Sequence, residues 1–521
     1  MIPQPTLLEL LHSAWDRYGD KPAFHCLGRS LAYRELDELS AALCAYLQHR
    51  TGLQPGDRVA IQLPNLLQYP VAVYAALRAG LVIVNTNPLY TPRELQHQYH
   101  DAGVKAVITL EGLEEQARTA LPGHSTELVI TTAPTDLHTP LECMDANNHI
   151  PGPVRPLRQV LAAGRQLEPI PFAPAPDDLA LLQYTGGTTG VAKGAMLSHR
   201  NLAANVAQIT EHAAESFLEG QEIYVAPLPL YHIYAFNLNC LALPSRGGAS
   251  ILVPNPRDID AFIEAIRLHP FTGFVGINTL FTALCRHPGF RQLDFSHLRS
   301  TAAGGMALGE CVARQWQSLT GVEVGEGYGM TETAPVIASN PRPGIQPGTV
   351  GKPVPQTEVK VIDSDGLALA HGESGELCVR GPQVMQGYWQ RPEATAEVLD
   401  SEGWLRTGDV AIIQPDGYIR IVDRLKDVIV VSGFNVYPHE VEEVASAYPG
   451  VLECAAISVA SDTSGEAVKL YLVAQDAQLD TEDLRRYLRQ HLAAYKVPTQ
   501  YELRLELPKS NVGKILRREL R

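Results

Sequence analysis

The sequence lacks the features that mark disulfide-stapled, zinc-binding and nucleic-acid-binding proteins. Its eight cysteines are scattered and include no Cys-x-x-Cys pair, so neither a disulfide framework nor a zinc knuckle is indicated. Basic residues are outnumbered, with 42 Lys and Arg against 57 Asp and Glu and a formal net charge of −15, so we expect no nucleic-acid partner. A reducing compartment, the cytoplasm, fits this composition best.

Long uninterrupted apolar runs are also missing. The most apolar stretch, residues 59–84, is broken by residues that would each be costly inside a bilayer: Gln62, Pro64, Asn65, Gln68, Pro70 and Arg78. The first residues contain no basic segment of the kind that begins a signal peptide, and residues 6–11 predict an amphipathic helix instead. We therefore expect neither export nor a membrane span, while peripheral contact with the inner face of the membrane stays open.

The chain is long enough for more than one domain, because 521 residues, 45% of them hydrophobic, can bury several cores. Over residues 59–108 short apolar strands alternate with helical patterns, and the same rhythm resumes at residue 179, which predicts α/β layers. The intervening residues 132–178 are rich in Pro, Gly and Ala and are predicted to be a connection.

A different pattern follows in the last third of the chain. Between about residues 345 and 423, half-buried strands alternate with Gly and Asp turns, which predicts a small β-barrel. Residues 424–521 predict a compact α+β module of independent domain size. The sequence thus predicts an α/β protein. Its large N-terminal domain, residues 1–423, would combine layered α/β subdomains with the barrel, and residues 424–521 would form a small C-terminal domain.

A glycine-rich loop follows the apolar strand predicted at residues 179–184. Glycines let successive backbone N–H groups turn toward an anion and threonine hydroxyls add donors, so the loop is predicted to cradle phosphates. It differs from a Walker loop, because Ala192 precedes the lysine and Gly194 follows it. A flexible linker is the alternative, which the flanking strand and helix signals disfavour. The loop residues with donors or glycine backbones are Thr185, Gly186, Gly187, Thr188, Thr189, Gly190 and Lys193.

The loop and five further segments occur in the order typical of one enzyme superfamily. Four of these segments are residues 227–233, 277–281, 381–385 and 431–438, and the fifth is a glycine-hinged lysine turn at residues 507–514. Over nearly its whole length the sequence resembles the adenylate-forming enzymes, the superfamily of acyl-CoA synthetases, luciferases and peptide-synthetase adenylation domains. Among them it is most similar to the bacterial long-chain fatty acid CoA ligases.

This resemblance implies an AMP-forming acid–thiol ligase that works in two steps. A medium- to long-chain fatty acid and ATP would give acyl-AMP and pyrophosphate, and acyl-AMP and CoA would then give acyl-CoA and AMP, with Mg²⁺ as cofactor. Lys514 would neutralise the attacking carboxylate and the bridging phosphate oxygen. The C-terminal domain that carries it would be mobile and would turn about Lys426 between the two steps.

The resemblance also assigns residues to the nucleotide and metal sites. The expected catalytic residues are Thr185, Lys193, His232, Glu332 and Lys514. Glu332 and Thr188 would hold Mg²⁺, which prefers oxygen ligands. Besides the loop, the expected ATP- and AMP-binding residues are Gly304, Gly305, Met306, Glu326, Gly327, Tyr328, Gly329, Thr331, Asp409, Ile421, Arg424 and Lys514. The two oxygens of the Asp409 carboxylate suit a ribose diol.

The acyl chain and CoA are assigned in the same way. The expected acyl-pocket residues are Tyr231, His232, Phe236, Asn278, Thr279, Phe281, Gly304 and Val336, with Phe236 where some relatives carry a bulky gate. In the rotated arrangement the turn of Ser432, Gly433 and Phe434 would form the tunnel for the pantetheine of CoA.

Several of these residues have a simpler structural interpretation when the resemblance is set aside. His232 lies in an aromatic segment and reads as a core histidine. The Thr331–Glu332 pair reads as a helix cap, and residues 302–307 read as a tight turn. Lys426 belongs to a charge run that is usually a solvated face.

Three other functions stay open. An acyl-AMP ligase that loads an acyl carrier protein would carry an insertion that hinders rotation, and none is found in residues 334–423. A ligase for a branched, hydroxylated or aryl acid is an alternative, because residues 123–175 are short and proline-rich where long-chain relatives are longer and more basic. A non-catalytic acyl or nucleotide sensor is disfavoured, because the charged residues it would lose are all present: Lys193, Glu332, Asp409 and Lys514. A homodimer has no linear signature and stays open too.

Overall fold

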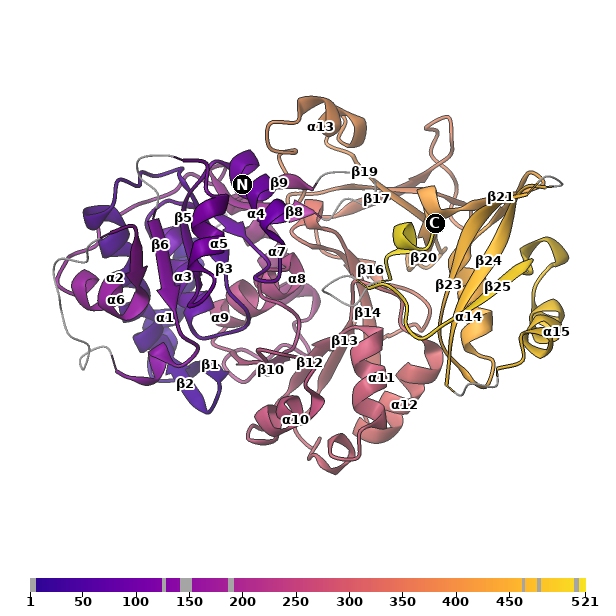
Figure 1. Cartoon of the computed structure of the whole chain (residues 1–521), viewed down its shortest axis with the longest axis horizontal. Helices are drawn as coiled ribbons and strands as arrows, with labels where there is room; N and C mark the ends of the chain where they lie inside the picture. Colours follow the sequence, from indigo (N-terminus) through magenta and orange to yellow (C-terminus); the bar gives the residue numbers. More distant parts are fainter. Residues whose placement is uncertain are drawn as a thin grey trace.

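The computed structural model describes residues 6–123, 128–140, 152–185, 192–461, 464–475, 479–509 and 515–521. Within these residues the strands form four sheets, of nine, seven, five and four strands. Figure 1 shows the chain running from the two large sheets and their helices to a group of strands at the right that ends the molecule. In the described ranges no helix is both long and apolar enough to cross a lipid bilayer.

The seven-stranded sheet has the order β7-β6-β5-β3-β4-β8-β9 and is parallel apart from the β8–β9 pair. Both faces are covered: Ala106 and Ile108 of β5 pack into one core, and Val107 packs into another. The elements are α2 (Tyr33–Arg50), β3 (Arg58–Gln62), α3 (Gln68–Arg78), β4 (Val82–Asn85), α4 (Pro92–Ala102), β5 (Val104–Leu110), α5 (Glu114–Ala120), β6 (Leu128–Thr132), η1 (Asp136–His138), β7 (Val154–Pro156), α6 (Leu157–Gly164), β8 (Leu179–Thr185) and β9 (Lys193–Ser198).

The nine-stranded sheet has the order β16-β15-β14-β13-β12-β10-β11-β1-β2, so its strands come from both sides of the seven-stranded sheet in the sequence. β1 pairs in parallel with β11, with Phe24 opposite Ser250. The elements are α1 (Leu7–Tyr18), β1 (Pro22–Cys26), β2 (Arg29–Ala32), α7 (His199–His212), β10 (Ile223–Ala226), α8 (Ile233–Ala235), the π-helix η3 (Phe236–Ala242), α9 (Leu243–Ser245), β11 (Ala249–Leu252), α10 (Ile259–Arg267), β12 (Gly273–Gly276), α11 (Asn278–Arg286), η4 (Phe290–Gln292), β13 (Ser300–Ala303), α12 (Glu310–Thr320), β14 (Val324–Gly329), η5 (Thr331–Thr333), β15 (Val336–Ser339) and β16 (Lys352–Pro353).

The strands predicted as part of a small barrel form an antiparallel four-stranded sheet. Its strands β17 (Glu358–Ile362), β18 (Ser374–Arg380), β19 (Leu405–Ile413) and β20 (Ile419–Arg424) pair in sequence order, and in the described chain β17 and β20 are the two ends of that order. The edge of β20 that faces away from β19 pairs with the segment before β16. The N–H of Val350 donates to Ile419 O, and the N–H of Ile419 donates to Gly351 O, both at 2.8 Å. The sequence therefore predicted the half-buried strands, but not the pairing of β20 with Val350 and Gly351. Helix α13 (Pro392–Val398) lies between β18 and β19.

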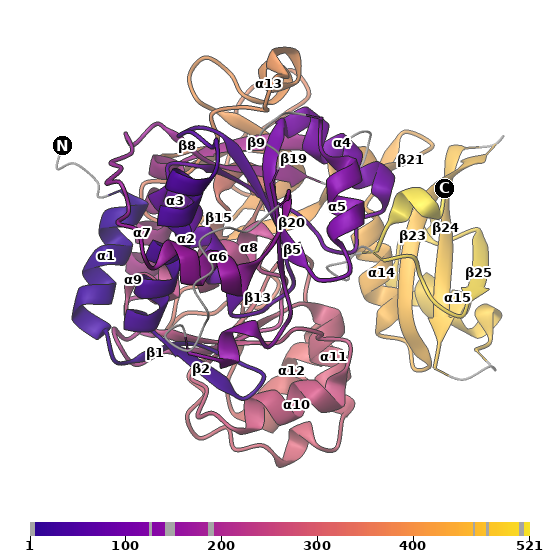
Figure 2. The same ribbon diagram turned by 60° about the vertical axis from the view of Figure 1, so that its left-hand side comes forward.

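The last hundred residues have their own sheet and core. β21 (Ile429–Val431), β22 (Phe434–Val436), β23 (Val451–Ser461), β24 (Gly465–Ala474) and β25 (Gln500–Arg504) form the sheet, with η6 (Leu425–Asp427), α14 (Pro438–Ser446), α15 (Thr481–His491), η7 (Ala494–Lys496) and η8 (Arg517–Glu519). The two hydrophobic clusters of this part contain only residues from Ile429 to Leu520. Figures 1 and 2 both show it at one end of the molecule. A domain boundary at residues 423 and 424 stays a prediction, supported by this separate core.

Local signals were read correctly in two places and missed in one. The helix predicted at residues 6–11 and helix α4, within the predicted α/β alternation of residues 59–108, both begin with capping boxes, in which Thr6 or Thr91 pairs with the glutamate three residues later. The predicted connection at 132–178 instead contains η1, β7 and α6, and α6 buries Val160 and Leu161 against the main core. This helix has only eight residues, too few to stand out in a segment rich in Pro, Gly and Ala.

Candidate active site

The carboxyl ends of parallel strands from both large sheets meet at one cleft of about 3260 Å³. Asn85 and Thr185, the last residues of β4 and β8, line it together with Ile277 after β12 and Gly304 after β13. This is where open α/β sheets bind their ligands, because the loops that follow the strands diverge there. The C-terminal part closes one side of the cleft with residues of β23, α14 and η8.

Most of the residues predicted for the site line this cleft. The described ones that do so are Thr185, Lys193, Tyr231, His232, Asn278, Thr279, Gly304, Gly305, Met306, Glu326, Gly327, Tyr328, Gly329, Thr331, Glu332, Val336, Asp409, Ile421, Arg424 and Lys426. The structure brings them together from segments that are far apart in the sequence. Gly186, Gly187, Thr188, Thr189, Gly190 and Lys514 lie outside the described residues.

Two residues predicted for the acyl pocket lie elsewhere. Phe236 begins the π-helix η3, is 1% exposed and belongs to the main core. Phe281 is fully buried, with its ring 4.8 Å from that of Trp316. On α11 the polar residues Asn278 and Thr279 face the cleft, so the apolar face of this amphipathic helix, Phe281 included, turns into the core.

The turn predicted to contact CoA does not line the cleft in this arrangement. Ser432 and Gly433 have positive φ angles of 51° and 85° between β21 and β22. The Phe434 ring is 58% exposed and stacks on Tyr495 at 5.0 Å. Because the prediction concerned a rotated arrangement, the role of this turn stays a prediction.

Glu332 is a buried carboxylate held by a tyrosine that the sequence analysis did not single out. The hydroxyl of Tyr388 donates to Oε1 of Glu332 at 2.7 Å. Burial raises the pKa of Glu332, and the hydrogen bond from Tyr388 partly offsets this rise. A carboxylate in such surroundings gains stability from a nearby cation, so the donor set fits a Mg²⁺ ion that also binds phosphate oxygens.

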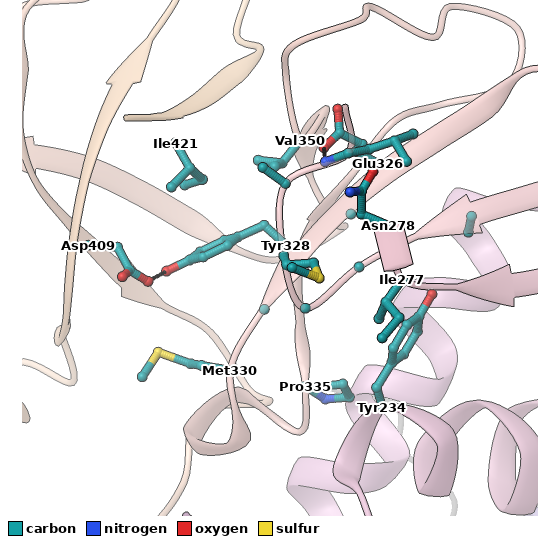
Figure 3. Close-up of a pocket in the computed structure, with 18 of the residues that line it drawn as sticks. Tyr234, Ile277, Asn278, Glu326, Tyr328, Met330, Pro335, Val350, Asp409 and Ile421 are labelled. Carbon is teal, nitrogen blue, oxygen red and sulfur yellow. Dashed lines mark hydrogen bonds between the residues drawn. The ribbon is translucent and has the colours of Figure 1, made fainter. Parts of the chain in front are cut away.

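Asp409 on β19 forms a second charged centre, opposite the last residue of β20. It faces Arg424 across the two strands, with 3.4 Å between Arg424 Nε and Asp409 Oδ1. Tyr328 donates its hydroxyl to Asp409 Oδ2, and Figure 3 shows the ring extending toward Asp409 along this dashed bond. Asp409 is 8% exposed, so its carboxylate is fixed between a cation and a phenol at the edge of the cleft.

The segment after β10 places a histidine and a tyrosine against the glycine-rich backbone. Nδ1 of His232 accepts a hydrogen bond from the backbone N–H of Tyr234 at 3.3 Å, so the neutral ring carries its proton on Nε2. The Tyr234 ring lies against Gly304, where an added Cβ would be 3.1 Å from its Cε1 atom. Figure 3 shows Tyr234 and Ile277 on the opposite side of the view from Asp409.

Glu326 on β14 leads to a prediction about pH. It accepts a hydrogen bond from the N–H of Leu308 at 3.0 Å, and burial raises its pKa from 4.5 to about 7. The folded protein therefore binds this proton more tightly than the unfolded chain does. The stabilisation is complete below about pH 4.5 and is lost as the pH rises through about 7.

We expect Glu326→Gln, which cannot ionise, to melt a few degrees above the parent protein at pH 8 and close to it at pH 5. Thermal melts at the two pH values check this, with exposed Glu323→Gln as the control. Equal melting temperatures of Glu326→Gln and the parent at pH 8 would contradict the assignment.

The ends of the segment that carries Lys514 are held at the cleft. Lys509 and Ile515, which are bridged in antiparallel fashion, both line it. Nζ of Lys509 is 2.5 Å from Glu453 Oε1. After Ile515 in the sequence, Arg517 forms hydrogen bonds to Glu442 at 2.7 and 2.8 Å. Arg521 forms an ion pair with Asp427, next to Lys426, at 2.7 Å.

Sequence reasoning missed a group of apolar residues that line another part of the cleft. We call this group the apolar branch; the residues belong to one hydrophobic cluster and are Ala213, Phe217, Tyr224, Leu238, Val275 and Ala302. They come from the segment that follows α7 and from β10, η3, β12 and β13. Each looks like an ordinary core residue in the sequence, so no local signal identified them.

Comparisons with known proteins agree on one family. The AMP-binding enzyme model matches residues 11–389, and the AMP-binding enzyme C-terminal domain model matches residues 440–514. The chain is 48% identical to a long-chain-fatty-acid–CoA ligase of Salmonella typhimurium, over 99% of this chain and 94% of that protein. It is 36% identical to a feruloyl-CoA synthase of an Amycolatopsis species, over 95% of this chain and 94% of that protein. ATP-bound MatB from Rhodopseudomonas palustris superposes with a TM-score of 0.87 at 30% identity, over 99% of this chain and 98% of that one.

Proposed function

The chain belongs to the family of AMP-binding enzymes, and from this premise we propose that it is an ATP-dependent fatty acid–CoA ligase. The fatty acid carboxylate displaces pyrophosphate from ATP and forms acyl-AMP. The thiol of CoA then loses its proton and displaces AMP, which gives acyl-CoA. The observation that carries the proposal is that one cleft joins a charged nucleotide site, at Glu332 and Asp409, to the apolar branch.

The described residues have distinct roles in the first step. Asp409 accepts hydrogen bonds from the ribose hydroxyls, and Arg424 orients that carboxylate. Thr185 and Lys193 stand at the two ends of the phosphate loop and bind the triphosphate. His232 and Gly304 lie where the carboxylate enters. Glu332 would hold Mg²⁺, which would supply charge neutralisation for the phosphates.

Lys514 completes the site in this proposal. Its neighbours Lys509 and Ile515 line the cleft, which supports delivery of its ammonium group to the reacting carboxylate and phosphate. The thioester step then requires the C-terminal part to turn about Lys426, so that the turn of Ser432, Gly433 and Phe434 receives the pantetheine. Movement of this kind agrees with a small domain that has its own core.

The apolar branch supports an alkyl chain as the acyl group. Each methylene buried from water contributes about 0.8 kcal/mol, so a branch walled by side chains such as Phe217, Leu238 and Val275 favours longer acids. Glu332 and Asp409, where the nucleotide is expected, are instead held by polar groups: Tyr388 donates to Glu332, and Tyr328 and Arg424 contact Asp409. A similar division between one polar end and one apolar pocket is common in small-molecule sites.

Filling the apolar branch should shorten the preferred acid. We expect Ala213→Phe to lower kcat/KM for a sixteen-carbon acid by about 10- to 100-fold and to change that for an eight-carbon acid little, because only the longer chain needs the filled space. Ala214→Phe is the matched control, since Ala214 is adjacent and exposed. An equal loss with both acids would show that the substitution acts on the fold instead of on chain length.

Two related activities are distinguished in the same assay. The relative named feruloyl-CoA synthase keeps an aryl acid as an alternative substrate, and an acyl carrier protein is the alternative acceptor. The protein is incubated with ATP, Mg²⁺ and acids of increasing length, ferulic acid included, with and without CoA, and AMP and thioester are measured. Acyl-CoA that peaks at one chain length supports the ligase, whereas adenylate without thioester points to a carrier protein.

We also propose that the enzyme acts in the cytoplasm, in peripheral contact with the membrane that holds its substrate, and as a homodimer. The seven described cysteines are free thiols, which supports a reducing compartment. Flotation with phospholipid vesicles tests the membrane contact, and sedimentation velocity tests the dimer.

A further inference from the structure

Tyr388 contacts two groups of opposite charge that the proposed function assigns to ATP binding. Its hydroxyl donates to Glu332 Oε1 at 2.7 Å, and Nζ of Lys193 lies over its ring, 5.0 Å from the centroid. Glu332 belongs to η5 and Lys193 begins β9, so one side chain bridges two elements that approach the triphosphate from different sides. The Tyr388 side chain is 9% exposed, so water competes little for either contact.

The backbone around Tyr388 fixes this position firmly. Tyr388 bridges to Ala195 in antiparallel fashion, and the N–H of Trp389 donates to Gly194 O at 2.8 Å, so the segment extends the edge of β9. On the other side, the N–H of Met385 donates to Glu332 O at 2.8 Å. The N–H of Tyr388 is also bound, to Thr395 Oγ1 at 2.9 Å. The ring therefore has little freedom to leave the space between Glu332 and Lys193.

The chemistry of this arrangement explains why a tyrosine suits the position. A buried lysine and glutamate that meet directly form an ion pair, and each then has less charge to offer a ligand. A phenol presents a donor to the carboxylate and an electron-rich face to the ammonium group, so it satisfies both without neutralising either. Phenylalanine would keep the second contact and lose the first.

We propose that Tyr388 is a positioning residue that orients the Glu332 carboxylate through its hydroxyl and holds the Lys193 ammonium over its ring. It keeps these opposite charges apart and available, one for the divalent cation and the other for the phosphates. This inference rests on the proposed function, because it takes Glu332 and Lys193 to be groups that bind Mg²⁺ and ATP.

Two substitutions separate the two contacts. With Tyr388→Phe we expect the Mg²⁺ concentration for half-maximal adenylation to rise about 10- to 100-fold, as for loss of one hydrogen bond to a charged group, while KM for the fatty acid stays unchanged. Tyr388→Leu removes the ring as well, so it should also raise KM for ATP at saturating Mg²⁺. A readout independent of activity is the binding of Mn²⁺ to the protein with a non-hydrolysable ATP analogue, measured by electron paramagnetic resonance. Mn²⁺ binding should weaken in Tyr388→Phe by the same factor.

Tyr184→Phe is the matched control, because its hydroxyl donates to a different carboxylate, Asp101 Oδ2, at the same 2.7 Å. It should leave the Mg²⁺ dependence as in the parent protein. A Tyr388→Phe variant with parental Mg²⁺ dependence and Mn²⁺ binding would overturn the proposal, as would an equal shift in Tyr184→Phe. Thermal melting shows whether each variant is folded. In a Glu332→Gln background, the effect of Tyr388→Phe on Mn²⁺ binding should disappear.

The same measurements distinguish failure of the proposed function from failure of the inference about Tyr388. If the parent protein binds Mn²⁺ with the ATP analogue and Tyr388→Phe weakens that binding, the inference holds even where no fatty acid is adenylated. If fatty acids are adenylated and Tyr388→Phe changes neither measurement, the function holds and the inference fails.

Discussion

Replacement of Lys514 by alanine is expected to lower the rate of acyl-adenylate formation by about 10² to 10³ or more. The first step brings a carboxylate against a triphosphate, so a cation placed between them stabilises charge that develops in the transition state. The second step starts from an adenylate that is already formed and has no such anion pair. The Lys514→Ala variant should therefore convert added acyl-AMP and CoA to acyl-CoA at a rate within a few fold of the parent protein.

Pyrophosphate release in single-turnover reactions measures the first step, and thioester formation from synthetic acyl-AMP measures the second. Lys509→Ala is the control, because this lysine lies on the same segment but is paired with Glu453. Loss of both half-reactions to the same extent in Lys514→Ala would contradict the assigned role, and so would full adenylation.

Asp409→Ala should have the second-largest effect, a fall in kcat/KM for ATP of about 10² to 10³. The substitution removes two acceptor oxygens from the ribose, and each hydrogen bond to a charged group is worth about 1.5 to 3 kcal/mol. It also leaves Arg424 and the hydroxyl of Tyr328 without the carboxylate that they share, so the edge of the cleft loses its fixed geometry. KM for the fatty acid should change little.

The substrate provides a sharp test of the same residue. ATP without its 2′ and 3′ hydroxyls should be a poor substrate for the parent protein, and the further loss on Asp409→Ala should be much smaller with this analogue than with ATP. Asp416→Ala, at the exposed turn of the same β19–β20 hairpin, is the control. Equal losses with both nucleotides would mean that Asp409 acts only through the fold.

The fold was predicted where the sequence pattern is local. Alternating strands and capped helices identified β3, β4, β5 and β8, because burial on both faces and capping leave a mark within a few residues. The pairing of β20 with Val350 and Gly351 involves residues about seventy positions apart, and nothing local records it. The sequence therefore predicted these half-buried strands without this long-range pairing.

The residues of the candidate site were likewise predicted only where the sequence carries a local signal. Glycine runs and isolated charges such as Glu332 and Asp409 stand out in the sequence. Charged residues are rarely buried unless they are paired, and glycine permits backbone conformations that other residues avoid. Tyr388 and the apolar branch do not stand out, since aromatic and aliphatic residues usually serve the core. Phe236 and Phe281 show the opposite error: they lie next to site residues in the sequence, but the helices that hold them turn them inward.

The nine-stranded sheet has a consequence for how the protein is made. β1 and β2 leave the ribosome first, yet the parallel partner of Phe24 is Ser250, more than two hundred residues later. The strands of the seven-stranded sheet all lie between these two points and form a complete sheet of their own. Because sequence-distant pairing is slow and domains tend to fold during synthesis, the seven-stranded sheet has the chance to assemble while the first hairpin waits without its partner. The exposed edge of that waiting hairpin is the point at which a nascent chain of this architecture most needs protection from aggregation.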